Sequence, residues 1–158
     1  MKKSAVLLIA LTFVAGACSG GDDTNKVAPV ASAVPSTVAV GVTATVTPID
    51  AGVSVKSGAG EFQPITGPTD LQSGDLVRTD DTGFAEVNYP DGSVTRLDVN
   101  TEFEVMSITD NAGVATTRAN LNGGRVWSRV NDLGTEGEFS VDTSVGVATV
   151  RGTAFMVE

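Results

Sequence analysis

The stretch FAEVNYPDGSVTRL at residues 84–97 contains the strongest structural signal in this chain. Apolar and polar residues alternate on both sides of its centre, which is the period-two pattern of a half-buried β-strand. At the centre, Pro90 has a φ angle suited to the first position of a turn, and Gly92 can adopt the left-handed conformation that a later position needs. The sequence therefore predicts a β-hairpin in which residues 84–89 pair with residues 94–99.

The alternation continues from about residue 49 onward. Phe103 and Val105 alternate with glutamates, and the phase slips at Met106, which predicts a β-bulge there. No window has a convincing helical period, and turn-forming residues recur at nearly regular spacing. We therefore predict an all-β fold, a single domain of short, mostly antiparallel strands in a sandwich, jelly roll or short β-solenoid. One longer strand face is expected to contain Phe139, Val141, Thr143, Val145 and Val147.

The composition excludes several classes of function. The chain has 158 residues, 41% of them hydrophobic, and its 10 Lys and Arg against 19 Asp and Glu give a net charge of −9. A chain of this length supports one core, and its acidity argues against binding to nucleic acid or to an anionic lipid surface. The absence of His excludes a Ser-His-Asp triad and His-ligated metal sites, and the single Cys excludes an internal disulfide.

Residues 1–17 have the three-part plan of a secretory signal peptide. Two lysines supply positive charge, and the apolar stretch that follows is shorter than the roughly 20 residues that cross a bilayer. The small residues that end at Cys18 resemble a bacterial lipobox, which implies cleavage before Cys18 and lipidation of this cysteine. The alternative is an ordinary signal peptide, whose cleavage would leave a free N-terminal thiol.

Residues 18–47 contain few large side chains and are rich in Gly, Ser, Thr, Ala, Asp and Pro. This composition predicts a flexible tether, because it offers too little apolar surface to form a core. A first strand within residues 38–46 is the alternative for the last part of this segment. The β domain is then predicted to cover residues 48–158.

Five sequence blocks resemble the FecR domain family, in the family's order and with similar gaps. They are GDLVRT at 74–79, GFAEV at 83–87 with DGSVTRL at 91–97, NTEFEV at 100–105, LNGGRV at 121–126, and FSVDT at 139–143 with VATVRGTAF at 147–155. Two departures stand out, since Ser144 replaces a usual Pro and the family domain usually continues beyond the position of Glu158. We therefore expect the β domain to be incomplete at its C-terminal end, because residues 154–157 would otherwise be an apolar edge.

The resemblance implies an extracytoplasmic module, located at the cell membrane or in the outer membrane and periplasm. The family's namesake controls a sigma factor through a cytoplasmic segment, which an acylated mature chain would lack. We predict a non-catalytic, lipid-anchored binding module of the bacterial envelope whose partner is an envelope protein or wall glycan. One alternative is a part of a sigma-factor signalling relay that acts with a separate membrane-spanning partner, and a second is a glycan-binding or wall-modifying protein.

The resemblance also supplies candidate site residues. Arg78 and Arg151 would either form a cradle for a carboxylate or phosphate ligand or pair with aspartates such as Asp75 or Asp91. We favour the structural pairing, and expect Arg151→Ala to lose several kcal/mol through a broken, partly buried charge pair. The complete set of family-motif candidates is Gly74, Asp75, Arg78, Thr79, Asp91, Gly92, Ser93, Arg151, Gly152 and Thr153.

A second candidate lies at Arg125, Trp127 and Arg129, which alternation predicts on one strand face. The face would be either a sugar-stacking platform or a cation–π ladder exposed to solvent. Asp residues near turns would form a Ca²⁺ site, a pair of glycosidase carboxylates or, most commonly, turn caps. We predict no catalytic residue, cofactor or metal.

Overall fold

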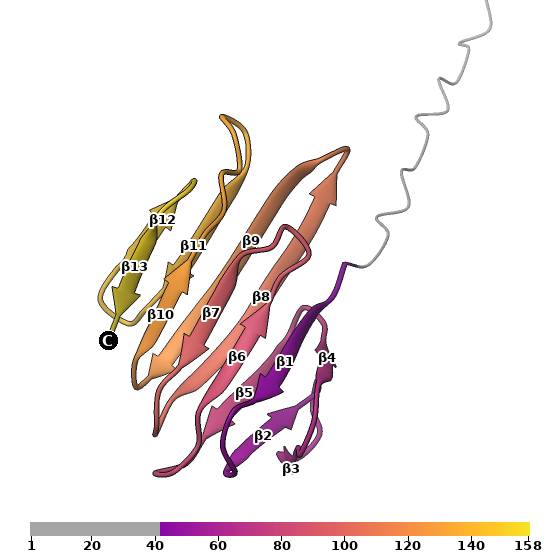
Figure 1. Cartoon of the computed structure of the whole chain (residues 1–158), viewed down its shortest axis with the longest axis vertical. Helices are drawn as coiled ribbons and strands as arrows, with labels where there is room; N and C mark the ends of the chain where they lie inside the picture. Colours follow the sequence, from indigo (N-terminus) through magenta and orange to yellow (C-terminus); the bar gives the residue numbers. More distant parts are fainter. Residues whose placement is uncertain (1–41) are drawn as a thin grey trace, which may run out of the picture. The chain divides into compact units, whose positions relative to one another are not determined.

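The computed structural model describes residues 42–158, which form thirteen β-strands (Figure 1). No helix, and hence no bilayer-spanning helix, occurs in this range. Cys18, the predicted signal peptide and most of the predicted tether lie outside the described residues. The strands are β1 (Ala44–Pro48), β2 (Val53–Lys56), β3 (Gln63–Pro64), β4 (Thr69–Leu71), β5 (Asp75–Thr79), β6 (Ala85–Asn88), β7 (Val94–Leu97), β8 (Glu102–Asn111), β9 (Val114–Gly123), β10 (Val126–Arg129), β11 (Glu138–Asp142), β12 (Val147–Val150) and β13 (Ala154–Val157).

The strands form two sheets. Sheet A has the order β13-β10-β7-β6-β1-β4, and sheet B has the order β12-β11-β9-β8-β5-β2-β3. The chain returns repeatedly from one sheet to the other, because β4, β5 and β6 lie in sheets A, B and A in turn. Every strand pair is antiparallel except β9 with β11, which is parallel and carries an ion pair between Arg118 and Asp142. The predicted all-β, mostly antiparallel fold is confirmed, as a two-sheet sandwich.

The β6–β7 hairpin forms where the sequence predicts it. Its register pairs Ala85 with Leu97 and Asn88 with Val94. The Tyr89 N–H donates to the Ser93 carbonyl at 2.9 Å, which closes the turn, and the left-handed position is taken by Gly92 with φ of 80°. The turn chemistry and the strand alternation therefore agree with one another.

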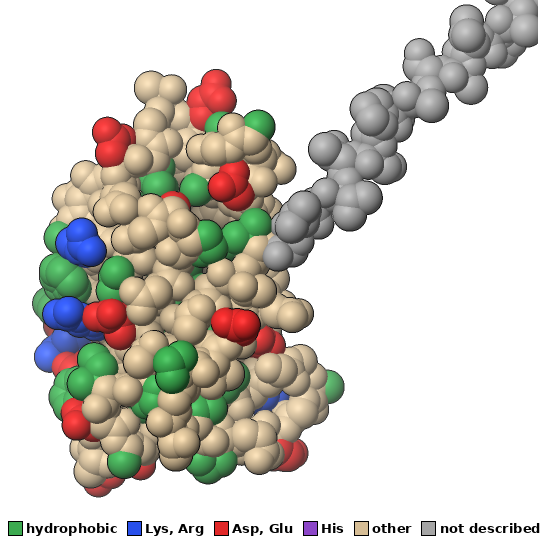
Figure 2. All heavy atoms as spheres, turned by 45° about the vertical axis from the view of Figure 1, so that its right-hand side comes forward, with side chains coloured by type: hydrophobic (Ala, Val, Ile, Leu, Met, Phe, Trp, Pro, Cys, Tyr) green, Lys and Arg blue, Asp and Glu red, His purple; other side chains and the backbone are tan. Residues whose placement is uncertain are grey.

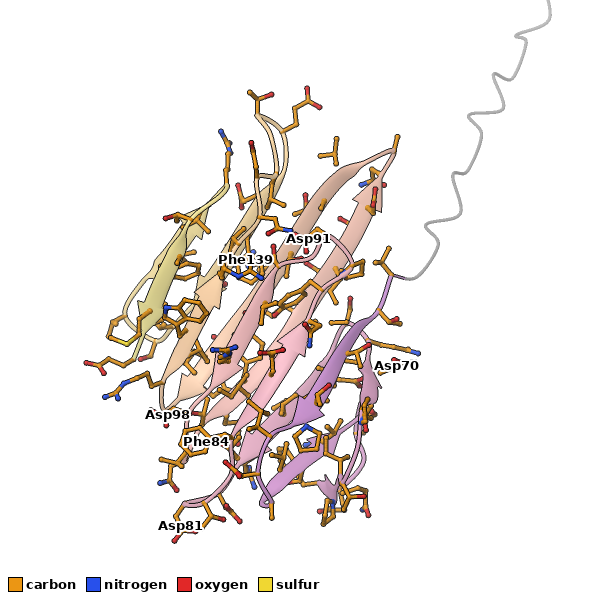
Figure 3. All side chains as sticks on the ribbon, viewed as in Figure 1. Asp70, Asp81, Phe84, Asp91, Asp98 and Phe139 are labelled. Atoms are coloured by element: carbon orange, nitrogen blue, oxygen red, sulfur yellow. The ribbon has the colours of Figure 1, made fainter. Side chains whose placement is uncertain are left out.

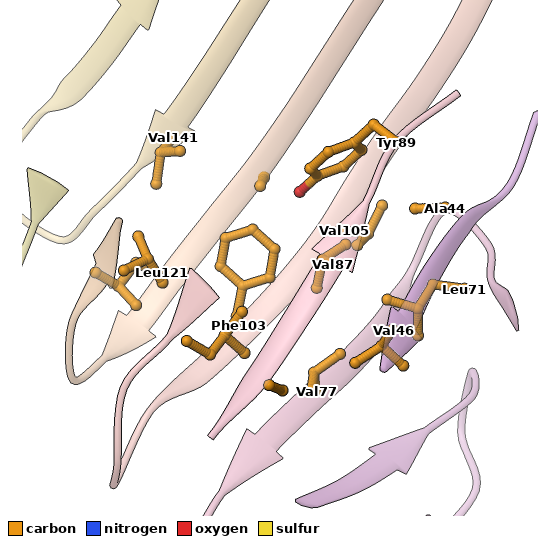
Figure 4. Close-up of a cluster of buried hydrophobic side chains, with 14 of the residues drawn as sticks. Ala44, Val46, Leu71, Val77, Val87, Tyr89, Phe103, Val105, Leu121 and Val141 are labelled. Atoms are coloured by element: carbon orange, nitrogen blue, oxygen red, sulfur yellow. The ribbon is translucent and has the colours of Figure 1, made fainter. Parts of the chain in front are cut away.

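The core lies between the sheets and consists of alternate, inward-facing side chains of both (Figure 4). Val87 of sheet A and Val77 and Phe103 of sheet B are wholly buried there. Tyr89 and Phe139 pack edge to face, with ring centroids 5.2 Å apart. Most core residues are β-branched, so Tyr89, Phe103 and Phe139 are the bulkiest side chains of the core.

The predicted bulge at Met106 is present. The register of β8 against β9 shifts between Val105 and Ser107, and Met106 is 40% exposed. After the shift, Ile108 faces the core with 6% exposure. One extra residue therefore restores an inward apolar side chain to the second half of a ten-residue strand.

The first strand overlaps the end of the predicted tether, where a strand within residues 38–46 is the alternative prediction. β1 starts at Ala44, within the segment 18–47 that was predicted to be a tether, and it pairs with both β4 and β6. Ala44 and Val46 are fully buried. Two small inward side chains are sufficient here, because the strand lies between two others and its neighbours supply the remaining apolar surface.

The single strand face predicted from Phe139 to Val147 is wrong in its second half. β11 ends at Asp142, and the Thr143 hydroxyl oxygen accepts hydrogen bonds from the N–H groups of Val145 and Gly146 at 3.2 and 3.1 Å. Val145 is consequently 91% exposed in a turn. Apolar residues keep their period-two spacing through this turn, although β11 ends before it and β12 begins after it.

Candidate functional site

The outward side of β7, β10 and β13 presents a group of arginine, tryptophan and methionine side chains. We call it the arginine–tryptophan face and define it as Arg96, Arg125, Trp127, Arg129 and Met156. Along β10, Val126 and Ser128 are buried while the residues between them are exposed. Trp127 and Arg129 therefore share the exposed face of β10, and Arg125 is exposed directly before the strand.

Trp127 lies at the centre of this face and is 39% exposed. The strand register sets it opposite Arg96 of β7 on one side and opposite Met156 of β13 on the other. The Arg96 guanidinium lies 5.7 Å from the centroid of the Trp127 ring, within the range of a cation–π contact. The cation over the ring thus comes from the neighbouring strand instead of from the predicted ladder along β10, because cross-strand neighbours are closer than residues two apart on one strand.

Carboxylates hold two of the three arginines of this face. Arg96 Nε donates to Glu86 Oε2 at 3.0 Å, and Arg125 Nε donates to Glu158 Oε2 at 2.8 Å. These side chains are half exposed, so each ion pair contributes less than about 1 kcal/mol and mainly orients the guanidinium. Arg129 forms no ion pair within residues 42–158, which leaves its guanidinium available to another carboxylate.

The face differs in charge from the rest of the domain. Residues 42–158 contain seven Lys and Arg against seventeen Asp and Glu, and three of the seven belong to this face. In Figure 2, acidic side chains are spread over the visible surface, whereas most of the basic ones gather along its left margin. A partner with carboxylates would therefore meet less repulsion at the arginine–tryptophan face than elsewhere.

The family-motif residues at the β6–β7 turn form a hydrogen-bond network that fixes the turn to the segment after β10. Asp91 accepts hydrogen bonds from the Ser93 N–H at 2.9 Å and from the Ser93 hydroxyl at 2.8 Å. Asn131, which follows β10, donates its side-chain amide to the Asp91 carbonyl at 2.9 Å and its N–H to the Ser93 hydroxyl oxygen at 3.1 Å. Ser93 is fully buried, and a Cβ on Gly92 would lie 2.6 Å from the Asn131 amide nitrogen.

Residues 151–153 pack against the same segment. The Leu133 N–H donates to the Arg151 carbonyl at 2.8 Å, and the Val130 N–H donates to the Thr153 carbonyl at 2.9 Å. A Cβ on Gly152 would lie 3.1 Å from Asp132 Cα, so this glycine permits a close backbone approach. The fold thus brings the second and fifth sequence blocks together around residues 131–133.

Main-chain hydrogen bonds hold residues 151–153 against residues 130–133, and the Arg151 side chain takes no part in them. Arg151 is exposed and forms no ion pair within the described residues, while the Asp91 carboxylate is occupied by Ser93. The predicted pairing of Arg151 with an aspartate is therefore wrong. The predicted loss of several kcal/mol in Arg151→Ala has no structural basis either.

The first family block has a structural role at both ends of β5. The Gly74 N–H donates to the Val105 carbonyl at 2.7 Å, and the Asp75 carboxylate accepts the Gln72 N–H at 2.8 Å. At the other end, the buried Thr79 hydroxyl donates to the Asp98 carbonyl at 2.6 Å. These contacts fix the turns that enter and leave the strand.

Arg78 is held on the outer surface of sheet B. Its Nη2 atom lies 2.6 Å from Glu102 Oε2, and its guanidinium lies 3.8 Å from the centroid of the Phe62 ring. Three strands separate β5 from β12, after which Arg151 follows. Neighbouring strands are about 4.8 Å apart, so the alternative of a two-arginine cradle is wrong, as is the predicted pairing of Arg78 with Asp75.

The turn aspartates do not converge on one point. Asp91 precedes β7 and Asp98 follows it. Figure 3 shows these two residues well separated along the strands, and Asp81 lies toward the same end of the strands as Asp98. Within residues 42–158, no three acidic side chains lie close enough to hold a metal ion. Asp80 accepts hydrogen bonds from the N–H and the hydroxyl of Thr82, both at 2.9 Å, which lower the pKa of its carboxyl.

A cleft of about 600 Å³ lies beside the β1–β2 connection. Ile49 and Ile65 contribute apolar surface to it, and Arg78 and Asp80 stand at its border. Asp50 also lines it, and of the three charged residues Arg78 is engaged with Glu102 and Asp80 with Thr82. The cleft therefore offers a ligand apolar contacts and the exposed Asp50 carboxylate.

Sequence reasoning missed three residues of these sites. Arg96 and Met156 join Trp127 through strand pairings that local alternation does not reveal. Asn131 fixes the β6–β7 turn across a gap of 40 residues in sequence. The hairpin register alone would have identified the pair of Arg96 with Glu86, since the turn fixes which residues face each other.

A family model described as FecR protein matches residues 75–158, which is more than half of the chain and extends from β5 to β13. None of the curated proteins and none of the solved structures matches the chain. FecR domains are typically extracytoplasmic, are generally non-catalytic, and are typical of sigma-factor regulatory relays. The order of the motif blocks, the all-β fold and this match agree, and the chain belongs to the FecR family.

Proposed function

We propose that this protein is a non-catalytic, lipid-anchored interaction module outside the cytoplasm, and that it works in a cell-surface relay controlling a sigma factor. The observation that carries the proposal is the match of β5 to β13 to the FecR domain, a module typical of such relays. The arginine–tryptophan face supports a protein-binding role, because Trp and Arg are enriched among the residues that dominate binding energy at protein interfaces.

The anchor in this proposal is lipid attached to Cys18. The apolar stretch before this residue is too short to cross a bilayer, and it ends in small residues followed by the chain's single cysteine. Several acyl chains hold a protein stably at a membrane, whereas one chain alone binds marginally. A chain anchored in this way lies outside the cytoplasm, so a separate membrane-spanning partner must act on the sigma factor.

The contact with that partner is assigned to the arginine–tryptophan face. Arg96 and Arg125 are already oriented by Glu86 and Glu158, so they lose less conformational freedom on binding than free side chains would. The available guanidinium of Arg129 can bind a carboxylate through two parallel hydrogen bonds. These features favour an acidic protein surface as the partner's contribution.

A photo-crosslinking amino acid placed at Trp127 of the full chain, in cells that make the protein, tests the protein contact. We expect an adduct with a membrane-spanning protein that has a cytoplasmic segment. The matched control is Phe62, which contacts Arg78 and lies directly before β3 of the other sheet, and this adduct should be absent there. An equal yield of the adduct at both positions, or none at Trp127, would contradict the assignment.

The relay and the anchor are tested by transcription. Deletion of the gene should change the transcript level of a sigma-factor-dependent set of genes, and the parent chain should restore it. Cys18→Ser should fail to restore it and should fail to incorporate labelled palmitate. Transcript levels that are the same with and without the gene would overturn the signalling role, and palmitate on Cys18→Ser would overturn the anchor.

Glycan binding is the second candidate, favoured by the exposed ring of Trp127 with a polar surround, since aromatic faces stack on sugar rings. Sedimentation of the protein with insoluble peptidoglycan tests it. Retention that is lost in Trp127→Ala and kept in Phe62→Ala would support this function. Retention that is absent in the parent chain, or unaffected by Trp127→Ala, would reject it.

A further inference from the structure

The cleft of about 600 Å³ beside the β1–β2 connection lies apart from the arginine–tryptophan face. β1 and β2 are near one end of the strand orders of their sheets, whereas β10 and β13 are at the other end of sheet A (Figure 1). Most of the residues that line the cleft precede residue 75, where the match to the FecR model begins. The cleft is therefore a separate feature that the family match does not describe.

Main-chain hydrogen bonds hold both walls of the cleft in place. The β1–β2 connection forms the first wall, and the Ile49 N–H there donates to the Phe84 carbonyl at 2.8 Å. The segment after β3 forms the second wall, and the Ile65 N–H donates to the Val53 carbonyl at 3.0 Å. The cleft is therefore preformed, and a ligand does not have to order its walls on binding.

Both walls present apolar side chains to the cleft. Pro48 and Ile49 belong to the first wall, and Pro64 and Ile65 to the second. Ile49 is 57% exposed, and Ile65 packs only partly against the core. Apolar surface inside a preformed cleft favours a ligand with an aliphatic part, because binding removes both surfaces from water.

The charged groups of the cleft favour a cation. The Asp50 side chain is exposed and forms no ion pair within residues 42–158. Asp80 stands at the border, where hydrogen bonds from Thr82 stabilise its ionised form. The positive charge of Arg78 is compensated by Glu102. A positively charged ligand therefore complements the cleft, and Asp50 is the carboxylate available to it.

We propose that this cleft binds a lysine side chain of a second partner protein, with the aliphatic stem between Ile49 and Ile65 and the ammonium group at the Asp50 carboxylate. Lysine suits the cleft because its four-carbon stem lies along apolar surface while its charged end stays in water. Apolar residues on either side of the lysine would cover the remaining isoleucine surface. The apolar contacts supply most of the affinity, because an exposed ion pair adds little, and the carboxylate supplies the selectivity for a cation.

Cross-linking of the full chain to a synthetic peptide tests the proposal. The probe is Ala-Ile-Lys-Ile-Ala, acetylated and amidated at its ends, so that the lysine amine is its single reactive group. A carbodiimide activates a carboxylate of the protein, the amine attacks the activated carbon, an amide bond forms and the carbodiimide leaves as a urea. Mass spectrometry then gives the yield at each carboxylate. Glu136 is the control, since it is exposed between β10 and β11 and forms no ion pair in the part of the chain that the structure describes.

We expect the yield at Asp50 to exceed the yield at Glu136 by about tenfold or more at low peptide concentration, because a bound lysine is held at a high effective concentration beside Asp50. The same peptide with glycine in place of both isoleucines should lose most of this preference. Equal yields at Asp50 and Glu136, or equal yields at Asp50 from the two peptides, would overturn the proposal.

A pair of variants tests the apolar wall. Ile49→Ser should lower the yield at Asp50 by about fivefold or more, because the lysine stem loses its apolar contact. Met106→Ser is the matched variant, since it removes an exposed apolar side chain from β8, and it should leave the yield unchanged. Both side chains are exposed, so thermal unfolding should show that both variants stay folded. An unchanged yield in folded Ile49→Ser would contradict the assignment of the stem to this wall.

Discussion

The hydroxyl oxygens of Thr95 and Ser128 lie 2.9 Å apart in the core, and both side chains are fully buried. The two residues face each other across the β7–β10 pair. Each hydroxyl therefore compensates the other for the loss of water, which is the condition for burying polar groups without a large penalty.

Replacing Thr95 with Val should destabilise the protein by about 1–3 kcal/mol, because the buried Ser128 hydroxyl loses its partner. The double variant Thr95→Val with Ser128→Ala should recover part of that loss, since neither hydroxyl is then left unsatisfied. Urea unfolding of the parent, both single variants and the double variant measures the coupling. Additive losses in the double variant would show that the two hydroxyls are not coupled.

Tyr89→Phe should stabilise the protein by about 1 kcal/mol, because the buried Tyr89 hydroxyl meets no hydrogen-bond criterion within the described residues, and the Thr95 hydroxyl near it is already paired with Ser128. The edge-to-face contact with Phe139 is kept in the variant. Burial raises the pKa of the Tyr89 hydroxyl, so it stays protonated at neutral pH. The midpoint of thermal unfolding measures the effect, and a lower midpoint in Tyr89→Phe would indicate a hydrogen bond lost with the hydroxyl.

The ionised Asp80 carboxylate stabilises the folded state, so the free energy of unfolding should decrease as the pH falls and this group becomes protonated. Hydrogen bonds from the Thr82 N–H and hydroxyl lower the pKa of the Asp80 carboxyl in the folded state, so its contribution is present above the unfolded-state pKa. That contribution is lost as the pH drops through the folded-state pKa. A carboxyl NMR titration should place the Asp80 midpoint below its ordinary value and should show it rise in Thr82→Val. A midpoint unchanged by Thr82→Val would mean that the hydroxyl does not contribute.

The features that could be predicted from the sequence are those that depend only on residues close together in the chain. The turn at Pro90 and Gly92, the bulge at Met106 and the outward side of Trp127 all follow from alternation and from turn chemistry over a few residues. The same reasoning failed at Val145, because a pattern of period two does not distinguish a continuous strand from two strands joined by a tight turn. Hydrogen bonds to Thr143 decide that point.

Long-range pairing accounts for most of what could not be predicted. The neighbours of Trp127, Arg96 and Met156, come from strands 31 and 29 positions away in sequence. The ion pair of Arg78 with Glu102 connects β5 to β8, and that of Arg125 with Glu158 connects the residue before β10 to the residue after β13. Asp75, a predicted partner of Arg78, is three residues away in sequence, whereas the actual partner Glu102 is set by the register of β5 against β8.

Arg151→Ala should change the free energy of unfolding by less than about 0.5 kcal/mol, as expected for an exposed side chain without an ion pair. Gly152→Val is the matched variant in the same turn. It should be clearly more destabilising, because a Cβ there already lies 3.1 Å from Asp132 Cα. Chemical denaturation of both variants compares them. A large loss in Arg151→Ala would restore the charge-pair interpretation of the family motif.

Alanine substitutions at Gly124 and Gly113 distinguish backbone strain from steric overlap. Both glycines have φ of 89°, so alanine suffers the same backbone strain at both, and the two positions differ in the space open to a Cβ. A Cβ on Gly113 meets no atom within 4 Å, so alanine there should cost about 1–2 kcal/mol, the penalty for a left-handed residue. A Cβ on Gly124 would lie 2.5 Å from Thr101 Cα and 2.6 Å from the Asn100 carbonyl oxygen. Alanine at this position must displace backbone and should cost about 1–3 kcal/mol more. Equal losses in urea unfolding would mean that the chain between β7 and β8 shifts freely, in conflict with the hydrogen bonds that hold Thr101 to Thr79 and Arg125.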